Sequence, residues 1–282
     1  MGNAQAGDSA VDGSDDEGGR ARRRILRIRG DAREAADDFI AEEVPVEMTY
    51  NGVPFAVMMA TPCDLEDLAL GFSLSEGLVR HRGQLLAIAV AHRLEGIELA
   101  MTVSADAPAS ALPADAARLL PGRSGCGLCG ARSLEDVLLP PSPLRDVRAF
   151  EATALQRALA ALGDHQPLNA TTGSTHAAAW ADADGNIVLS REDVGRHNAL
   201  DKLIGAMLRQ GLAPDAGMLL ISSRASYEMV SKAARAGIGF VAAVSAPTAL
   251  AVDIARGAGL CLVGFAREHG YNVYAGAERL LG

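Results

Sequence analysis

This sequence is short of positive charge and of aromatic residues. Its 282 residues include 26 Lys and Arg against 35 Asp and Glu, which gives a formal net charge of −9. A general nucleic-acid binder is expected to be basic, so we exclude nucleic acid as a partner. Aromatic residues make up only 4% of the chain, which is too few for the stacking platforms of proteins that bind single strands.

Long hydrophobic runs are also missing. The uncharged stretch of residues 236–252 has 17 residues and includes Pro247, whereas a helix needs ~20 apolar residues to span a bilayer. The Gly- and Asp-rich start of the chain lacks the apolar segment of a signal peptide. We therefore expect a soluble, cytoplasmic protein with no membrane partner.

Cysteine is scarce as well. The four cysteines, Cys63, Cys126, Cys129 and Cys261, are too few for a disulfide scaffold. In a reducing compartment such cysteines are more readily reactive or metal-bound than bridged. Cys261 lies in a short apolar segment that reads as a buried strand, and it is interpreted as a small hydrophobic residue, like Cys63.

The composition nevertheless allows a large core, because 49% of the residues are hydrophobic. The length fits one large domain or two modest ones. Residues 1–24 are rich in Gly, Asp and Ser and end in clustered arginines, so we predict a disordered tail there. We assign residues 25–145 to a β-rich N-terminal part and residues 146–282 to an α/β part, with three prolines near the boundary.

Turn and periodicity signals predict the elements of the N-terminal part. Asn51-Gly52 between two apolar runs predicts a β-hairpin of residues 44–50 and 53–60. Asp64 is predicted to cap a helix with an apolar face. A second strand pair is predicted at residues 85–94 and 97–103.

The C-terminal part has the rhythm of an α/β fold. Short apolar strands alternating with helices predict a largely parallel sheet covered on both faces. The predicted strands are residues 187–190, 218–221, 240–244, 260–265 and 272–274, and the predicted helices are residues 151–162, 198–208, 227–236 and 247–255.

The Cys-Gly-Leu-Cys segment, Cys126 to Cys129, has the residue types of a reactive thiol site. Arg123 and Arg132 flank it, and nearby cations favour the thiolate, which can attack a sulfur donor and carry a persulfide. The alternative is half of a zinc site, but zinc needs four ligands and the remaining cysteines are distant in the sequence. We favour the reactive pair and predict no tightly held metal.

A polar cluster at residues 191–202 joins a predicted strand to a helix. A helix start with basic neighbours suits an anion, and the basic residues are Arg191, Arg196 and Lys202. Asp193, His197 and Asp201 recur every four residues and would share a helix face if the helix began early. That spacing admits a metal, but we favour a capped helix with a polar face and expect Arg196 and His197 to bind a polar ligand.

Polar residues also follow three consecutive predicted strands. Because the carboxyl ends of parallel strands lie on one edge, where ligands bind, these residues are expected to form a phosphate cradle. They are Ser222, Ser223, Arg224, Ser245, Thr248 and the segment 265–270. Each Ser or Thr alone could equally be a helix cap. His176, after a polar turn, could be a ligand contact, an acid/base group or a structural residue.

In their order along the chain, these motifs resemble the formate dehydrogenase accessory sulfurtransferase (FdhD) family. The segments that carry the resemblance are residues 51–77, 124–130, 172–176, 191–202, 222–224 and 245–248, and the resemblance extends from about residue 43 to the C-terminus. It implies a homodimer with a cytidine-deaminase-like, three-layer α/β fold. It also implies transfer of sulfur from a cysteine desulfurase to the molybdenum bis(molybdopterin guanine dinucleotide) cofactor of formate dehydrogenase.

The resemblance also implies roles for individual residues. Cys126 would carry the persulfide with Cys129 as its helper, and the cofactor-binding stretch falls on Phe265, Ala266, Arg267, Glu268, His269 and Gly270. This chain departs from the family pattern at Ser174, where the family has Gly, and at Gly270, where it often has Arg; Arg267 or His269 are candidate substitutes.

Two alternatives accompany this interpretation. One is a non-catalytic chaperone that binds the cofactor and docks on an apo-oxidoreductase. The other is the zinc chemistry of deaminases, which needs His-x-Glu followed by Pro-Cys-x-x-Cys. Here alanines follow His176, and the Cys pair precedes it without a proline, so the deaminase site is absent.

Overall fold

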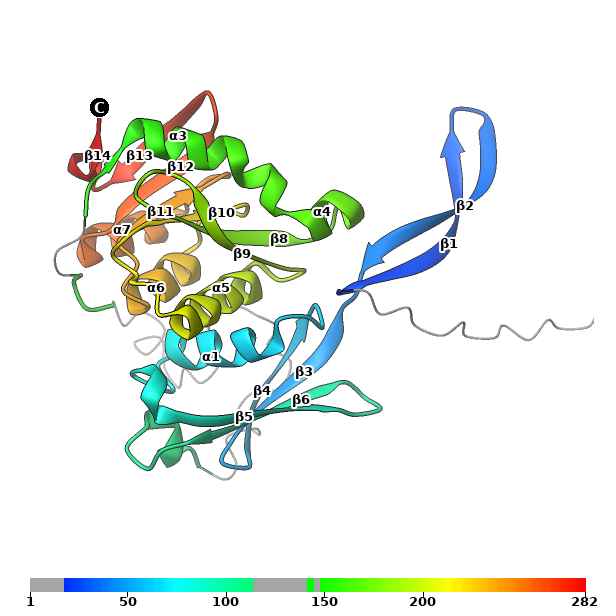
Figure 1. The fold of residues 1–282 in the computed structure, drawn as a ribbon, viewed down its shortest axis with the longest axis horizontal. Helices are drawn as coiled ribbons and strands as arrows, with labels where there is room; N and C mark the ends of the chain where they lie inside the picture. The colour runs from blue at the N-terminus through cyan, green and yellow to red at the C-terminus, as the bar shows by residue number, and fades with distance from the viewer. Residues whose placement is uncertain (1–17, 114–140, 145–147) are drawn as a thin grey trace, which may run out of the picture.

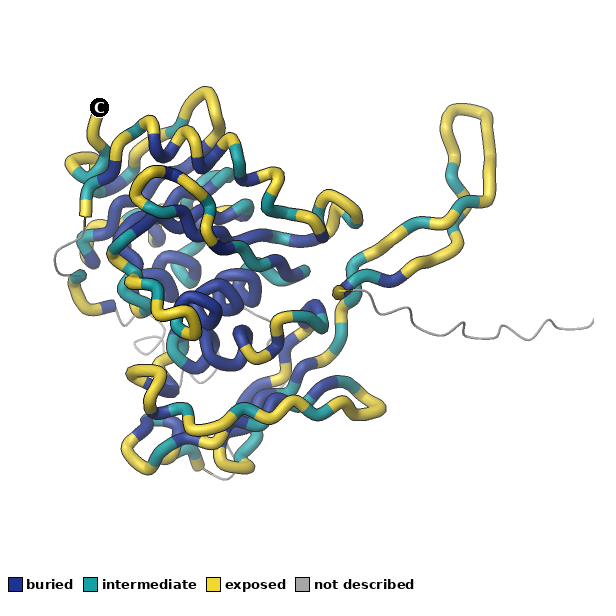
Figure 2. Tube along the Cα trace, in the orientation of Figure 1, coloured by how far each residue is buried: buried dark blue, intermediate teal, exposed yellow. Residues whose placement is uncertain are grey.

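The computed structural model describes residues 18–113, 141–144 and 148–282. Figure 1 shows three parts: a two-stranded arm that projects from the body, a small β-rich part and a larger α/β part. Buried residues concentrate in the two body parts and along their junction, while the arm is mostly exposed (Figure 2). No helix within the described ranges is long and apolar enough to cross a membrane.

The arm is an antiparallel hairpin of β1 (Arg20–Arg29) and β2 (Ala32–Ala41). The prediction of a disordered tail is therefore wrong for residues 20–24, which form the first half of β1, and residues 1–17 lie outside the described residues. The reason is complementary charge. Arg23 and Arg24 stand opposite Asp38 and Asp37 in the register, and Arg22 forms an ion pair with Asp37. Composition of the tail alone does not reveal that acidic partner strand.

The β-rich part is a four-stranded sheet with one helix on one face. The strand order is β4-β3-β6-β5, and only β3 and β6 pair in parallel. The elements are β3 (Val44–Tyr50), β4 (Val53–Ala60), α1 (Leu65–Ser75), the 3-10 turn η1 (Arg82–Gln84), β5 (Leu85–His92), β6 (Ile97–Val103) and η2 (Pro108–Ala111).

Both predicted strand pairs of this part are confirmed. Asn51 and Gly52 have φ of +49° and +79°, as a type I′ hairpin turn requires. The helix after Asp64 is confirmed too, with Leu68 and Phe72 buried in the core of this part. Its predicted cap is wrong in detail, because the Asp64 side chain makes no cap bond and its Oδ1 lies 3.3 Å from Arg191 Nε. The Asp64 carboxylate therefore interacts with Arg191 of the other part and not with the start of its own helix.

The α/β part is built around a six-stranded sheet. Its elements are β7 (Phe150–Glu151), α3 (Ala152–Ala161), η4 (Leu162–His165), α4 (Pro167–Thr172), β8 (His176–Ala181), β9 (Ile187–Asp193), α5 (Arg196–Gln210), β10 (Met218–Ile221), α6 (Tyr227–Arg235), β11 (Phe240–Ala243), α7 (Ala249–Ala258), β12 (Cys261–Arg267), β13 (Gly270–Ala275), η5 (Ala277–Arg279) and β14 (Leu280–Leu281). Helices α5, α6 and α7 share a core with one face, and α3 packs on the other.

The sheet is mixed, so the prediction of a largely parallel sheet is wrong. In the order β13-β12-β11-β10-β8-β9, only β10–β11 and β11–β12 are parallel pairs. Strands β8 and β9, like β12 and β13, are antiparallel neighbours. Each of these pairs is joined by a short turn, and short turns can connect only antiparallel strands.

Two glycines allow α1 and α5 to pack against each other closely enough to join the two parts. A Cβ placed on Gly71 of α1 would stand 1.7 Å from the backbone oxygen of Asp201, and one on Gly205 of α5 would stand 1.9 Å from that of Asp67. Each glycine therefore receives the backbone of the opposite helix. No side chain larger than hydrogen fits at either position without separating the helices.

We predict that Gly71→Ala lowers the free energy of unfolding by about 1–3 kcal/mol, the usual cost of overpacking. Chemical denaturation followed by circular dichroism measures this. Gly257→Ala is the matched control, because Gly257 also lies within a helix but its Cβ would meet no atom within 4 Å. The control should be neutral or stabilising by up to ~1 kcal/mol. Equal losses in both variants would contradict the close helix contact.

Candidate functional site

The loops after β10, β11 and β12 lie side by side at one edge of the six-stranded sheet. Phe265 N donates to Ser245 O at 3.1 Å, and Thr248 N donates to Ala225 O at 3.0 Å. The carboxyl ends of these parallel strands therefore converge as the sequence predicts. This edge, which we call the loop edge, brings together the predicted residues 222–224, 245–248 and 265–270.

Strand β8 and helix α5 begin at the same edge. Because β8 runs antiparallel to β10, its first residues meet the end of β10, and Ser222 N donates to Ala177 O at 3.0 Å. His176 pairs in register with Asp193, the last residue of β9, and α5 starts three residues later. His176, Arg196 and His197 thus join the loop edge. Sequence reasoning selected these residues but had no means of placing them beside the strand ends.

Three of the predicted hydroxyl groups hold the loops in place. Ser222 Oγ accepts from Ala177 N at 2.9 Å, and Thr248 Oγ1 accepts from Ala251 N at 3.3 Å, capping α7. Ser223 Oγ donates to Arg224 O at 3.1 Å. Ser222 and Thr248 each keep a hydroxyl proton to donate, but the backbone fixes their position. The helix-cap alternative is therefore correct for Thr248.

Buried polar groups without a protein partner gather at the start of α5 and α6. Within the described part of the chain, Arg196 Nε, His197 Nε2 and Ser226 Oγ are buried with no hydrogen-bond partner. The nearest carboxylate to His197 Nε2 is Glu228 Oε2, at 3.9 Å, which is too far for a hydrogen bond. Buried polar groups are normally paired, so these atoms indicate a polar ligand. Sequence reasoning missed Ser226 and Glu228, which read as an ordinary helix start.

The two histidines of the loop edge are neutral. Burial lowers the pKa of His197 to about 3, and the charges of Arg196 and Lys232 act in the same direction. Burial and Arg196 also lower the pKa of His176. A neutral imidazole has one donor and one acceptor nitrogen. The positive charge available here therefore comes from Arg196, the exposed Arg224 and Arg267, and the first turn of α5.

Phe265, at the β12 side of the loop edge, adopts a strained backbone conformation. Its φ is +51°, and its side chain is 46% exposed. Bulky residues rarely adopt positive φ, and such strain gathers at functional sites. Ala266 is buried, while residues 267–270 form the exposed turn into β13. At Gly270 a Cβ would meet open space, so an arginine would also fit there.

Several predicted charges have structural roles instead. Arg191 NH2 lies 2.7 Å from Asp67 Oδ2, and Lys202 Nζ lies 2.7 Å from Asp193 Oδ2 with both side chains fully buried. Neither Arg191 nor Lys202 is therefore free to hold an anion, because each neutralises a buried carboxylate. The expectation of three cations at this helix start is wrong for these two.

The spacing of Asp193, His197 and Asp201 does not create a metal site. Helix α5 starts at Arg196, so Asp193 lies before it and accepts from Gly195 N at 2.7 Å. Asp201 pairs with Lys232 at 2.9 Å. No group of three or more metal-ligating side chains is found in the described ranges.

The cysteines separate into two groups. Cys126 and Cys129 lie outside the described residues. Cys261 is buried in β12, and burial raises its pKa to about 12. Burial also raises the pKa of Cys63, although Lys202 Nζ lies 3.8 Å from its sulfur. Cys63 and Cys261 are therefore thiols, not thiolates, at neutral pH, in agreement with their interpretation as ordinary residues.

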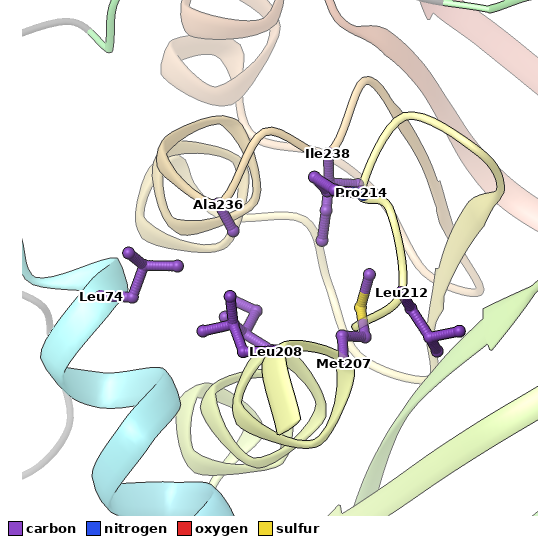
Figure 3. Close-up of a pocket in the computed structure, with 8 residues that line it drawn as sticks. Leu74, Met207, Leu208, Leu212, Pro214, Ala236 and Ile238 are labelled. Carbon is purple, nitrogen blue, oxygen red and sulfur yellow. The ribbon is translucent and has the colours of Figure 1, made fainter. Parts of the chain in front are cut away.

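An apolar pocket of about 240 Å³ lies where α1, α5 and α6 meet (Figure 3). Leu74, Met207, Leu208 and Ile238 are among its lining residues, all of which are apolar. Met207 is eleven residues along α5 from Arg196, about 16 Å at the helical rise. The pocket is thus separate from the loop edge, and its lining cannot hold a phosphate.

Comparison with known proteins identifies close relatives. The FdhD/NarQ family model matches residues 41–281. The sulfur carrier protein FdhD of Xanthomonas euvesicatoria pv. vesicatoria is 54% identical over 259 residues, 92% of this chain and 91% of that protein. The protein of the same name from Bordetella petrii is 48% identical over 258 residues, 91% and 92% of the two chains. A crystal structure described as a formate dehydrogenase accessory protein from Desulfotalea psychrophila has the same fold, with a TM-score of 0.71 at 22% identity, covering 93% of this chain and 99% of that one.

The low pKa of His197 predicts how stability depends on pH. Its folded-state pKa of about 3 lies below the ordinary 6.5, so protons bind the unfolded chain preferentially. The stability that neutral His197 contributes is complete above pH 6.5 and is lost as the pH falls towards 3, by about 1.4 kcal/mol per pH unit. His197→Gln should therefore flatten the dependence of Tm on pH between 6.5 and 4.

The control for this measurement is His269→Gln, because His269 is exposed in the β12–β13 turn. Its Tm should follow that of the wild type at every pH. A His197→Gln profile as steep as the wild-type profile would contradict the buried, neutral state of His197.

Proposed function

The chain belongs to the FdhD/NarQ family, and from that premise we propose that it is a sulfurtransferase required for formate dehydrogenase activity. It receives sulfur from a cysteine desulfurase as a persulfide and passes it to the molybdenum bis(molybdopterin guanine dinucleotide) cofactor. Its relatives from Xanthomonas and Bordetella are named sulfur carriers, which supports this assignment.

The observation that carries the proposal is the state of the other cysteines. Only a thiolate attacks sulfane sulfur, and burial keeps both Cys63 and Cys261 protonated. Of the four cysteines, Cys126 and Cys129 remain, flanked in the sequence by glycines and by Arg123 and Arg132. Cys126 is the persulfide cysteine in this proposal, and Cys129 assists it.

The loading step is a transfer of sulfane sulfur in which Cys126 is oxidised to a persulfide while the persulfide of the desulfurase is reduced to a thiolate. The Cys126 thiolate attacks the terminal sulfur of the desulfurase persulfide, a new S–S bond forms, and the desulfurase thiolate leaves. No metal and no external oxidant is required. A carrier built in this way needs only a reactive thiol and a second site for the sulfur acceptor.

The loop edge is that second site in this proposal. Phosphate groups of the guanine dinucleotide would interact with Arg224, Arg196 and the first turn of α5. The unpaired nitrogen of His197 and the unpaired Ser226 hydroxyl offer further hydrogen bonds. Strain at Phe265 on this edge supports a binding role for residues 265–270.

The remaining assignments follow from the same premise. We place the protein in the cytoplasm as a homodimer that interacts with a cysteine desulfurase and with formate dehydrogenase. The consecutive parallel strands β10, β11 and β12 with their helices support a cytidine-deaminase-like arrangement of the α/β part. The division near residue 146 is supported by the core of the β-rich part, which shares no buried residue with the two cores of the α/β part.

We predict that Cys126→Ala abolishes the gain of one sulfur atom, about 32 Da, after incubation with a cysteine desulfurase and cysteine. Activation of formate dehydrogenase should be lost with it. Intact-protein mass spectrometry measures the first and an enzyme assay the second. Cys63→Ala is the control and should load and activate like the wild type. A Cys126→Ala protein that still activates formate dehydrogenase fully would contradict the sulfurtransferase assignment and favour a non-catalytic chaperone.

We predict that Arg224→Ala weakens GDP binding by about 1.5–3 kcal/mol, the worth of a charge-assisted hydrogen bond. Persulfide loading should persist, because the desulfurase meets a different surface. Isothermal titration calorimetry with GDP measures the affinity. Arg82→Ala, an exposed arginine of η1 in the β-rich part, is the matched control. Equal affinities in all three proteins would place the nucleotide away from the loop edge.

A further inference from the structure

Along most of its length the arm formed by β1 and β2 is not covered by any other described residue of the chain. Its base is anchored: Glu42 N donates to Gly19 O at 2.8 Å, and Arg20 NH1 donates to Thr171 Oγ1 of α4 at 3.4 Å. Beyond the base, residues 22–29 and 32–39 extend away from the body (Figure 1). A two-stranded hairpin is marginally stable on its own in water. The distal arm is therefore expected to gain a partner.

One face of the distal arm is apolar and basic. Leu26, Ile28 and Phe39 are 59%, 56% and 39% exposed. Residues on one strand alternate between faces, so Leu26 and Ile28 share their face with Arg22 and Arg24. Asp37, which stands opposite Arg24 on the same face, forms an ion pair with Arg22, whereas Arg24 has no ion pair among the described residues. Exposed apolar side chains rimmed by charges mark interaction surfaces.

The charge of the arm is opposite to that of the body. Residues 20–41 hold seven arginines against four acidic residues, whereas residues 42–282 hold 19 basic and 26 acidic residues. The arm of one copy is thus attracted to the body of another. In a two-fold symmetric dimer both arms are occupied at once. The opposite charges of the arm and the body therefore favour a second copy of this chain as the partner over an unrelated acidic protein.

The body carries a surface that complements the arm. On the four-stranded sheet α1 covers the face of Met48, Met58 and Leu99, and no described helix covers the other face (Figure 1). On that outer face Val57 and Met59 of β4 are 55% and 39% exposed. Glu47 stands beside Val57 on one side and Glu98 on the other in the sheet register.

Two neighbouring glutamates on an uncovered sheet face repel each other. Arg93 of the same chain pairs with Glu98 at 2.7 Å, but Glu47 has no ion pair among the described residues. An arginine from a second copy would neutralise it while Val57 and Met59 met the apolar residues of the arm. The apolar and acidic outer face thus matches the apolar and basic arm.

We propose that the β1–β2 arm of one copy binds the outer face of the four-stranded sheet of a second copy, with Arg24 against Glu47 and with Leu26 and Ile28 against Val57 and Met59. The inference rests on the homodimer proposed above and identifies the element that forms it. A stable interface needs roughly 20–30 residues on each side. Two arms and two sheet faces, related by symmetry, can supply that number.

The test is sedimentation equilibrium of the full-length protein and its variants. The wild type should sediment as a dimer. Leu26→Asp with Ile28→Asp should raise the dimer dissociation constant at least tenfold, and Arg24→Glu should raise it as well. All three side chains are exposed and Arg22 keeps its pair with Asp37, so circular dichroism and Tm of the body should not change. Val188→Asp, an exposed apolar position of β9 at 49%, is the control and should remain dimeric.

Charge exchange tests the receiving face. Adding Glu47→Arg to the Arg24→Glu protein should restore most of the lost affinity, because opposite charges face each other again. A monomeric wild type, unchanged dimerisation in the arm variants, or absence of rescue by Glu47→Arg would each overturn the inference.

Sulfur loading of the same proteins separates this inference from the proposed function. Arm variants that remain dimeric but lose loading would assign the arm to the desulfurase and overturn the inference. Arm variants that dissociate, together with a wild type that takes up no sulfur, would overturn the proposed function and leave the role of the arm standing.

Discussion

The contact between α1 and α5 holds the two parts of the body together. Gly71 and Gly205 let the two backbones meet, and buried charges close the junction on both sides. Lys232 lies 2.6 Å from Glu76 and 2.9 Å from Asp201; burial alone would lower its pKa, but these carboxylates raise it above its ordinary value. Lys202 pairs with Asp193 and donates to Thr61 O at 3.0 Å. A buried charge that loses its partner strongly lowers the free energy of unfolding, so separation of the two parts would destabilise the protein.

That junction also fixes the candidate site. Asp193 accepts from Thr61 N of the β-rich part and from Gly195 N at the start of α5. The same carboxylate therefore orients the helix that brings Arg196 and His197 to the loop edge. Asp193 looks like a ligand contact in the sequence, but in the structure it holds the helix start that carries Arg196 and His197. The same hydrogen-bond network therefore stabilises the junction through Asp193 and presents Arg196 and His197 for binding.

The molecule thus offers three surfaces with different chemistry. The loop edge is polar, strained at Phe265 and supplied with unpaired buried groups. The arm is apolar and basic, and the outer face of the four-stranded sheet is apolar and acidic. In the function proposed above, the loop edge would meet the sulfur acceptor, while the arm and the outer face would meet a second copy, so these two encounters would not compete for the same residues.

Local signals in the sequence determined most elements and the set of candidate residues. The Asn51-Gly52 turn, the helix after Asp64 and the three short strands 218–221, 240–244 and 260–265 depend on nearby residues and were predictable. Tertiary structure decided what depends on distant partners. Asp37 and Asp38 pair with the basic strand that precedes them and order it. Arg191 forms an ion pair with Asp67, and Lys202 forms one with Asp193, so these charged groups are not available to a ligand. Short-range patterns report propensity, whereas pairing of buried charges and strand direction depend on which distant segments fold together.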